Sequence, residues 1–307
     1  MKNVGMKPDT LRSATAAARF YAPAHCLARI AERDTEKGDP QASARIAGIL
    51  AAKRTDELLP LCHPLPIHAA EVHFEIADDH VAIRAEVHTI GPTGVEMEAL
   101  TAASMAALTL YDMLKPYAEP DELAIGDTQL LDKTGGKSDH SRRLAEPLGA
   151  AVYMVSNPAA DGAKSDAAGR NTADALVSAG FAPLDYQVLR EEPEALAQTL
   201  DDAVAAHTPL VITVGGTGIG PRDQVVETIE PRLTTPMPGL METARAFGQK
   251  RSPYAVMSRG VAGFIGHTLV VTFPGSRRGA DETMAALLPS LIHILEIHAR
   301  FTADKPA

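Results

Sequence analysis

Candidate catalytic residues lie near both ends of residues 95–115, a segment without Gly or Pro. Asp112 and Lys115 are three residues apart, so on a helix they form a pair that can lower the pKa of the carboxylate or simply stabilise the helix end. Glu98 lies 14 residues before Asp112, on the same helical face but ~21 Å away along the axis. One nucleotide-sized ligand can hardly contact both residues. We therefore expect that a site using both is built by two chains.

Other polar residues of the first half could join this site, although each alone is more often a solvated surface residue. Cys62 and His63 lie between two prolines, in a stiff segment that would hold the imidazole in place. The candidate cations are Lys37, Lys53, Lys133 and Lys137. The last two flank a Gly-Gly turn, which could present flexible cations to phosphate or could be an exposed loop.

Common nucleotide and metal motifs are incomplete. The string GGKS at 135–138 has Leu131 where a phosphate loop needs Gly. The histidines at 63–88 lack the i,i+4 spacing of a helical metal site, so solvated imidazoles are favoured. Two cysteines are too few for a disulfide framework or a Cys-based zinc site, and they fit a reducing compartment.

The first half predicts an α+β unit that positions these groups. Asp39 as N-cap and Pro40 at the first position start a helix with Lys53 near its end, and we expect its apolar face to hold Ile46, Ile49, Leu50 and Leu58. Alternating apolar residues at 72–76 and 81–87 predict a hairpin with one buried face. Residues 95–115 predict a long helix that ends at Pro116, and residues 123–131 predict a strand before the loop DKTGGKS.

From residue 150 a different pattern begins. Short apolar runs at 150–156, 184–189, 209–214 and 268–273 alternate with helical segments at 165–180, 191–207, 222–233 and 280–300. This alternation is typical of a parallel sheet with helices on both faces. The polar, Pro- and Gly-containing segment 138–149 is the expected boundary, giving domains at 1–143 and 148–307.

A Gly-rich turn follows the strand predicted at 209–214. The backbone N–H groups of Gly215, Gly216, Thr217 and Gly218 can bind phosphate, although a tight structural turn is an alternative. Pro221 stands where a dinucleotide fingerprint needs Gly. Asp223 could bind Mg²⁺ or cap the next helix.

Composition sets the broad class. The 307 residues correspond to about two domains at roughly 150 residues each. The net charge of −10 and the 4% aromatic content without Trp oppose nucleic-acid binding. The N-terminus lacks the apolar run of a signal peptide, and no stretch approaches the ~20 apolar residues of a membrane span. We therefore expect a cytoplasmic protein that contacts neither nucleic acid nor membrane.

Residues 3–138 resemble the molybdenum cofactor biosynthesis protein C family, the cyclic pyranopterin monophosphate synthases. The resemblance rests on KGDPQASARIAGILAAKRTDELLPLCHPLPI, GPTGVEMEALTAASMAALTLYDMLK and LLDKTGGKS. It implies a ferredoxin-like α+β fold in a homo-oligomer, a hexamer built from dimers, with active sites between subunits. The implied reaction converts a cyclised dihydro-GTP to cyclic pyranopterin monophosphate and pyrophosphate, with no cofactor.

The resemblance also implies roles for individual residues. Asp112 matches the family's catalytic acid, and Lys37 and Lys115 match its catalytic lysines. The segments that bind substrate correspond to Leu61, Cys62, His63, Met97 and Glu98. The repeated proton transfers suit a Lys of lowered pKa beside a carboxylate. Lys53, Lys133 and Lys137, together with Lys37, could stabilise the negative charge that develops as pyrophosphate leaves.

Residues 150–300 resemble the molybdopterin-binding fold of the cofactor biosynthesis protein B and molybdopterin adenylyltransferase family, a three-layer α/β fold. The resemblance rests on VGGTGIGPRD, MPGLMETAR, AVMSRGVAG and VVTFPGSRRG. Active members bind molybdopterin, ATP and Mg²⁺ and join AMP to the pterin phosphate. The matching pocket residues are Gly215, Gly216, Thr217, Gly218, Asp223, Ser258, Arg259, Pro274, Gly275 and Ser276.

Two positions depart from that family's pattern. Glu191 stands where the family has a second catalytic aspartate, and Asn157 stands where an Asp is frequent. Glu is one methylene longer, and a displacement of ~1 Å can remove much activity. The C-terminal half is therefore expected either to bind molybdopterin and adenylate it or to be a non-catalytic pterin-binding or oligomerisation module. A further alternative makes the whole chain a pterin-binding scaffold.

Overall fold

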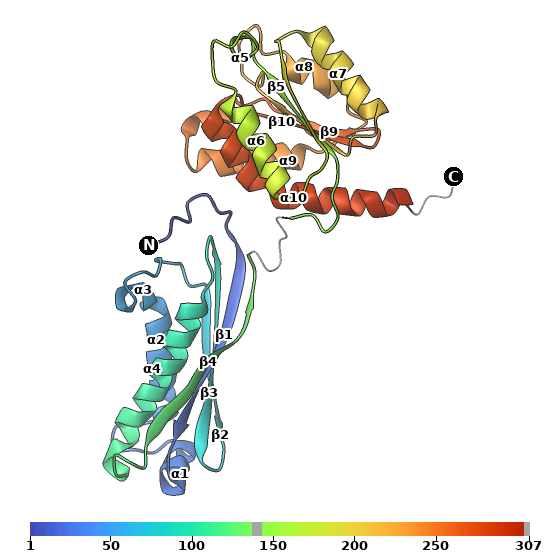
Figure 1. The fold of residues 1–307 in the computed structure, drawn as a ribbon. Coiled ribbons are helices and arrows are strands. Elements are labelled where there is room, and N and C mark those ends of the chain that lie inside the picture. The colour runs from blue at the N-terminus through green and yellow to red at the C-terminus, as the bar shows by residue number, and fades with distance from the viewer. Residues whose placement is uncertain (137–142, 304–307) are drawn as a thin grey trace. The chain divides into compact units, whose positions relative to one another are not determined.

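The computed structural model describes residues 1–136 and 143–303. The chain forms two compact units, Met1–His140 and Ser141–Ala307 (Figure 1). Each unit has its own buried hydrophobic residues. Lys137, one of the predicted cations, lies outside the described residues.

The N-terminal unit is a four-stranded antiparallel sheet in the order β2-β3-β1-β4, with helices packed on one face (Figure 1). Its strands are β1 Thr10–Tyr21, β2 Ala69–Ile76, β3 His80–Gly91 and β4 Ala124–Thr134. Its helices are α1 Ala24–Glu32, α2 Pro40–Lys53, α3 Thr55–Leu58 and α4 Glu96–Leu114, with the 3-10 turn η1 at Lys115–Tyr117. Strand β1 lies in the middle of the sheet, between β3 and β4.

The predicted hairpin and helix start are confirmed. Ile76 pairs with Val81 across the turn, and alternate residues of β3 are buried. The side chain of Asp39 accepts a hydrogen bond from Ala42 N at 3.0 Å, and Pro40 occupies the first helical position. Both features depend on residues that are close together in sequence: polar residues form the reverse turn, and Asp39 caps the start of the helix.

The apolar face predicted for α2 is largely wrong. Of the residues expected there, Ile49 is partly buried against the core, whereas Ile46 is 68% exposed and Leu50 is exposed. The helix ends at Lys53, so Leu58 belongs to the separate helix α3, where it is also exposed. The buried residues of α2 are instead small: Pro40, Ala44, Gly48, Ala51 and Ala52. This helix is oriented by close backbone approach rather than by burial of its largest side chains.

The opposing helix α4 supplies a matching row of alanines, which includes Ala102 and Ala106. A Cβ atom placed on Gly48 would lie 2.9 Å from the Ala102 carbonyl oxygen and 3.0 Å from the Val72 side chain. Two helices that touch this closely exclude larger side chains from the contact. The position of α2 therefore depends on the absence of a side chain at Gly48.

The C-terminal unit is a six-stranded sheet in the order β6-β5-β7-β10-β9-β8. Its strands are β5 Ala150–Val155, β6 Leu184–Leu189, β7 Leu210–Val214, β8 Thr235–Pro236, β9 Ala262–Ile265 and β10 Thr268–Phe273. The four predicted strands pair in parallel, as expected. The antiparallel edge formed by β9 and β8 was not predicted.

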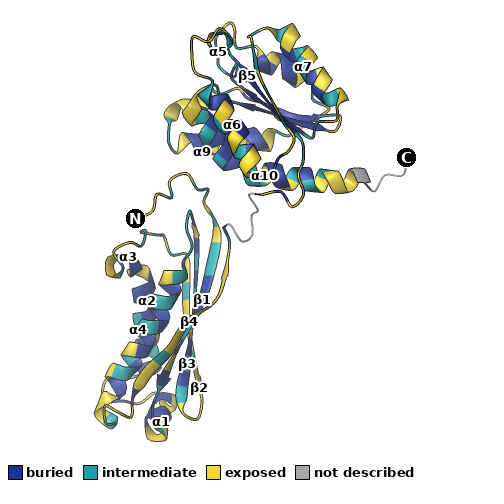
Figure 2. Ribbon diagram, in the orientation of Figure 1, coloured by how far each residue is buried: buried dark blue, intermediate teal, exposed yellow. Residues whose placement is uncertain are grey.

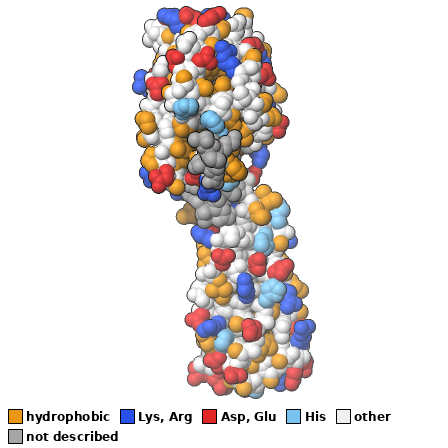
Figure 3. All heavy atoms as spheres, turned by 90° about the vertical axis from the view of Figure 1, so that its right-hand side faces the viewer, with side chains coloured by type: hydrophobic (Ala, Val, Ile, Leu, Met, Phe, Trp, Pro, Cys, Tyr) orange, Lys and Arg blue, Asp and Glu red, His pale blue; other side chains and the backbone are white. Residues whose placement is uncertain are grey.

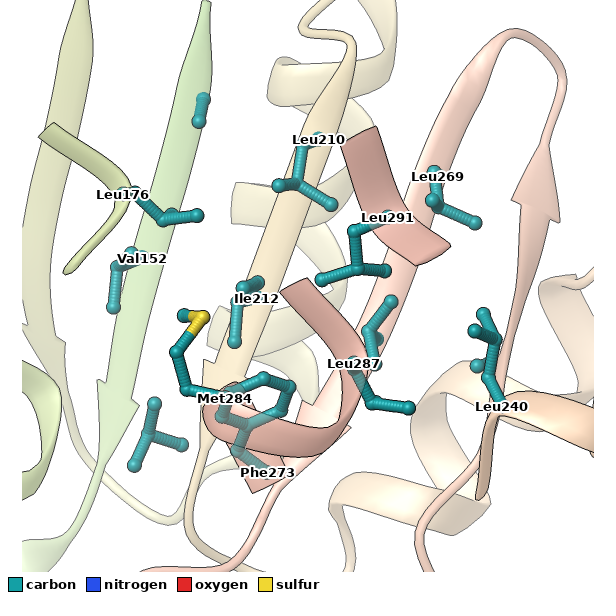
Figure 4. Packing of buried hydrophobic residues seen from close by; sticks show 14 of the residues in the cluster. Val152, Leu176, Leu210, Ile212, Leu240, Leu269, Phe273, Met284, Leu287 and Leu291 are labelled. Carbon is teal, nitrogen blue, oxygen red and sulfur yellow. The ribbon is translucent and has the colours of Figure 1, made fainter. Parts of the chain in front are cut away.

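Helices cover both faces of this sheet, so the unit has three layers (Figure 2). The helices are α5 Asn157–Ala160, α6 Ala167–Ser178, α7 Pro193–Ala205, α8 Val225–Ile229, α9 Pro238–Gln249 and α10 Arg277–Ala303. On one face, Leu176 of α6, Leu240 of α9 and Leu287 of α10 pack against the sheet (Figure 4). On the other face, Leu200 of α7 and Ile229 of α8 do the same.

One helix, α10, passes the length and composition test for a membrane span over residues Arg277–Phe301. Sequence analysis had found no stretch of that kind. The apolar residues Met284, Leu287 and Leu291 of this helix are buried against the sheet. Core packing therefore accounts for the apolar face of its first half.

We predict opposite effects for the same substitution at two helical glycines. Gly48→Ala is expected to lower the free energy of unfolding of the N-terminal unit by about 1–3 kcal/mol, because the new methyl group meets backbone atoms. Gly239→Ala in α9 is the matched control, since nothing lies within 4 Å of a Cβ there. It should raise stability by about 0.5–1 kcal/mol through helix propensity. Urea-induced unfolding, monitored by amide hydrogen exchange in α4 and in α9, gives the free energy of unfolding of each unit separately. Equal effects at the two positions would contradict this account of α2 packing.

Candidate functional site

Three of the predicted catalytic residues meet at the C-terminal end of α4. Lys37 Nζ lies 2.7 Å from Asp112 Oδ2 and also donates to the Asp112 carbonyl oxygen at 2.9 Å. Lys115 Nζ lies 2.9 Å from Asp112 Oδ1. Each carboxylate oxygen therefore holds one ammonium group. All three side chains are about half exposed, so a ligand can reach them.

This geometry fixes the charge state of Asp112. Hydrogen bonds from Lys37 and then Lys115 lower the pKa of Asp112 to about 2. The same contact raises the pKa of Lys115 rather than lowering it, contrary to the expectation of a lysine with lowered pKa. At neutral pH the carboxylate is therefore ionised, and the protons of the cluster reside on the ammonium groups.

A second group of predicted residues lies at the N-terminal end of α4. Glu98 is only 4% exposed, and burial, with added repulsion from Glu96 and Asp56, raises its pKa to about 7. Burial, with added repulsion from the charges of Glu98 and Asp56, also raises the pKa of the Cys62 thiol. The adjacent predicted substrate-binding residues Leu61 and Met97 are both exposed.

The predicted cations are positioned differently from the sequence expectation. Strand β4 extends to Thr134, so Lys133 lies on a strand and not in a flexible Gly-Gly turn. Its Nζ donates to Glu96 Oε1 at 3.0 Å. Lys53 is exposed at the end of α2, which runs antiparallel to α4 and ends toward the Glu98 end. His63 Nε2 donates to the Lys2 carbonyl oxygen at 2.7 Å.

The two groups are separated by the length of α4. Fourteen residues of helix at ~1.5 Å each put Glu98 and Asp112 ~21 Å apart. Each end carries a different chemistry: a charged Lys-Asp-Lys cluster at one end, and the buried carboxyl of Glu98 at the other.

The C-terminal unit contains a cavity of about 530 Å³ at the carboxyl ends of β5, β7 and β10. The chain passes from β5 to β6 on one side and to β7 on the other, so the cavity lies at the point where the strand order reverses. Open α/β sheets bind ligands at this location. The predicted residues that line the cavity are Glu191, Gly215, Gly216, Thr217, Gly218, Asp223, Ser258, Pro274, Gly275 and Ser276. The cavity therefore brings together residues from 154 to 283 of the chain.

Close backbone contacts shape the floor of this cavity. Gly215 and Gly216 have φ angles of +109° and +63°, a conformation that L side chains rarely adopt. A Cβ on Gly215 would lie 2.4 Å from the Val155 carbonyl oxygen, and one on Gly275 would lie 3.1 Å from Gly215 Cα. The turns after β7 and β10 can therefore touch only because both residues lack side chains.

The two departures from the family pattern are in direct contact. Glu191 Oε2 accepts from Asn157 Nδ2 at 3.1 Å, and Asn157 Oδ1 accepts from Glu191 N at 2.9 Å. Arg222 Nε lies 3.7 Å from the same Glu191 oxygen. Asp223 does not cap α8, as one expectation had it, but accepts from Gly220 N at 2.8 Å within the Gly-rich loop.

The donor set of the cavity fits a Mg²⁺ ion that arrives with a nucleotide. Glu191 and Asp223 both line the cavity. Within residues 1–136 and 143–303, no group of three His, Cys, Asp or Glu side chains could hold a metal. Mg²⁺ is commonly held by one or two carboxylates and completed by phosphate oxygens and water.

Sequence analysis missed the basic residues of the cavity. Lys164, Arg245 and Arg278 line it, from the loop before α6, from α9 and from α10. Glu282, which is 6% exposed, accepts from Arg278 Nε at 2.8 Å. On the face of the molecule in Figure 3, basic and acidic side chains are interspersed. Lys164, Arg245 and Arg278 come from separate segments of the chain, and only the fold brings them together at the cavity.

We predict that Glu98 makes the stability of the N-terminal unit depend on pH. Its pKa is raised on folding from 4.5 to about 7, so its favourable contribution is complete below pH 4.5 and is lost as pH rises through 7. Glu98→Gln should therefore gain about 2–3 kcal/mol relative to the parent chain between pH 4.5 and pH 8. Urea unfolding followed by amide exchange in α4 measures this, with Glu75→Gln on an exposed position of β2 as control. The same pH slope in both variants would contradict the burial of a proton-binding carboxyl.

Comparisons with known proteins assign both units. Family models match residues 1–136, as the MoaC family, and residues 151–293, as a probable molybdopterin binding domain. The molybdopterin biosynthesis Mog protein from Mycobacterium ulcerans is 36% identical, with a TM-score of 0.47, over 49% of this chain and 99% of that structure. A cyclic pyranopterin monophosphate synthase of Roseiflexus sp. is 51% identical over 140 residues, 45% of this chain and 87% of that protein.

The whole chain also has a relative of the same organisation. The molybdenum cofactor biosynthesis bifunctional protein of Chlorobaculum tepidum is 38% identical over 293 residues, which cover 95% of this chain and 92% of that protein. The two resemblances found in the sequence are thereby confirmed. The chain belongs to the family of bifunctional molybdenum cofactor biosynthesis proteins, with a MoaC-family domain followed by a molybdopterin-binding domain.

Proposed function

We propose that the N-terminal unit converts (8S)-3',8-cyclo-7,8-dihydroguanosine 5'-triphosphate to cyclic pyranopterin monophosphate and pyrophosphate. The observation that carries this proposal is the cluster of Lys37, Asp112 and Lys115, in which Lys37 lies 75 positions before Asp112 in sequence and both ammonium groups lie within 2.9 Å of the carboxylate. The matching relatives are named cyclic pyranopterin monophosphate synthases. No cofactor is required in this proposal.

The charges of the cluster suit the chemistry. Opening and rebuilding a purine-derived ring needs protons delivered and removed at defined positions. The ionised Asp112 orients two ammonium groups, which can donate protons to the substrate, and an amine that has donated its proton can accept one back from the substrate. The same ammonium groups, with Lys53 of a second chain, would stabilise the negative charge that develops on the phosphates.

The distance between the two ends of α4 supports an active site shared between subunits. The Lys37 cluster of one chain would face the Cys62 and Glu98 region of a second chain in a homo-oligomer. The β-α-β-β-α-β element order and the sheet order β2-β3-β1-β4 support the ferredoxin-like description of each subunit. Both cysteines are free thiols, which supports the proposed cytoplasmic location.

We predict that the purified protein releases pyrophosphate from the cyclised dihydro-GTP. Asp112→Asn should reduce turnover at least 100-fold, because it removes the charge that orients both ammonium groups. Pyrophosphate release in single-turnover experiments measures this. Asp127→Asn is the matched control, since Asp127 is also an exposed carboxylate in an ion pair with a basic residue, Arg19. Turnover by Asp112→Asn at the parental rate would reject the assignment.

Subunit mixing extends the same experiment. Asp112→Asn and Glu98→Gln chains, each impaired alone, should regain activity after they are unfolded together and refolded, because hybrid oligomers contain complete sites. Failure of the mixture to regain activity would reject a site shared between chains.

For the C-terminal unit, we propose that the cavity binds molybdopterin. The supporting observation is the Gly-rich backbone loop next to Lys164, Arg245 and Arg278, a combination that suits a phosphorylated, largely planar ligand. A second candidate function, adenylation of the bound pterin with MgATP, is favoured by Asp223 in the same cavity. The longer Glu191 in place of Asp favours the alternative of a non-catalytic binding or oligomerisation module.

We predict that the residue at position 191 determines whether the C-terminal unit adenylates molybdopterin or is a non-catalytic module. If the unit is an adenylyltransferase, MgATP and molybdopterin yield adenylated molybdopterin, and Asp223→Asn lowers the rate at least 100-fold while binding persists. Product formation measured by mass spectrometry is the readout. Activity that is gained only in Glu191→Asp supports the non-catalytic module. Absence of molybdopterin binding by the parent chain would reject the proposed binding function itself.

A further inference from the structure

Arg259 lies beside the cavity but does not line it. Its guanidinium borders a neighbouring hollow formed by the outer side of the Gly-rich loop and by Glu227 of α8. The resemblance had placed Arg259 among the pocket residues. The structure instead directs this side chain at the loop's backbone.

Four hydrogen bonds join Arg259 to the loop and to α8. Its backbone N donates to the Thr217 carbonyl oxygen at 3.0 Å. Its side-chain Nε donates to the Gly218 carbonyl oxygen at 2.7 Å, and Nη2 donates to that of Asp223 at 2.8 Å. The remaining nitrogen, Nη1, contacts the carboxylate of Glu227. One residue therefore holds the start and the end of the loop.

These contacts decide which backbone groups the loop presents. In a trans peptide the N–H points opposite to the C=O. Because the carbonyl oxygens of Thr217 and Gly218 face Arg259, the N–H groups of Gly218 and Ile219 point away from it. Ile219 lines the neighbouring hollow, whereas Gly218 lines the cavity. An anion there meets amide hydrogens, which attract it, and not carbonyl oxygens, which would repel it.

The loop has few other anchors. From Gly218 to Gln224 no residue is buried, and Ile219 is 76% exposed. Within the loop, Asp223 Oδ2 accepts from Gly220 N, and Asp223 N donates to the Gly220 carbonyl oxygen. Those two bonds close the tip but do not orient its base. The charge-assisted bonds from Arg259 do.

We propose that Arg259 is a positioning residue that pre-forms the anion-binding face of the 215–223 loop without touching the ligand. Glu227 balances its charge, so the guanidinium remains bound to the loop. The inference rests on the proposed binding of a phosphorylated pterin in the cavity. It assigns to Arg259 the selectivity for the phosphate group rather than for the pterin ring.

The test uses the full-length chain. It compares the binding of two ligands and also measures the amide exchange of the loop. Dissociation constants are measured for molybdopterin and for 6-hydroxymethylpterin, which has no phosphate. Amide exchange of residues 217–224 is measured without ligand. The variants are Arg259→Ala, Arg259→Lys and the control Arg232→Ala, since the Arg232 guanidinium also donates to a backbone carbonyl oxygen, that of Thr228, but Arg232 does not line the cavity.

Arg259→Ala should weaken molybdopterin binding roughly tenfold or more, leave 6-hydroxymethylpterin binding unchanged and speed amide exchange in the loop. Arg259→Lys should fall between the parent and Arg259→Ala, because an ammonium group cannot span both carbonyl oxygens. The control should match the parent.

Equal weakening of both ligands would overturn the proposal, since it would indicate a general structural role. Unchanged exchange in Arg259→Ala would overturn it as well. If the parent chain binds no molybdopterin, the proposed function fails, and loop exchange still decides whether Arg259 orders the loop.

Discussion

The close approach of α2 to α4 determines where the charged groups of the Lys37, Asp112 and Lys115 cluster lie. Gly48 and the surrounding alanines leave room for nothing between the two helix backbones. The packing fixes the position of α2 along α4, so that Lys37, just before α2, contacts Asp112 near the end of α4. A helix pair held further apart by larger side chains would separate this ammonium group from the carboxylate and lose the charge state on which the cluster depends.

The C-terminal unit depends on a similar constraint. Gly215, Gly275 and the Val155 carbonyl oxygen form a contact between three strand ends, and any side chain there would force them apart. That contact aligns the turns after β7 and β10 along one edge of the sheet. The cavity is thus a consequence of backbone geometry, and the side chains around it supply charge and shape. In both units, small residues rather than large ones set the positions of functional groups.

This reliance on small residues explains what the sequence could and could not predict. Strongly patterned elements were predicted: the β2-β3 hairpin, α4, and the four parallel strands of the C-terminal sheet. Strand β1, rich in alanine, and the buried face of α2 were missed or wrong, because Ala and Gly carry little periodic signal. The candidate residues of the cavity came from sequence motifs. Lys164 lies outside those motifs, and Arg245 and Arg278 lie within them but were not singled out, because only the fold brings the three cations together.

The contact between Asn157 and Glu191 changes how the departures from the family pattern should be understood. A carboxylate at position 157 would lie beside the carboxylate of Glu191 and repel it, whereas the amide donates one hydrogen bond and accepts another. Glu191 carries the same charge as the aspartate it replaces, so of the two departures only Asn157 changes the charge, and it removes one negative charge beside Glu191. With Asn157 neutral, the cavity carboxylates Glu191, Asp223 and Glu282 face the cations Lys164, Arg245 and Arg278 in equal number. An electrostatically balanced cavity can accept a phosphorylated ligand even though the chain as a whole carries a charge of −10, because binding depends on the charges within reach of the ligand.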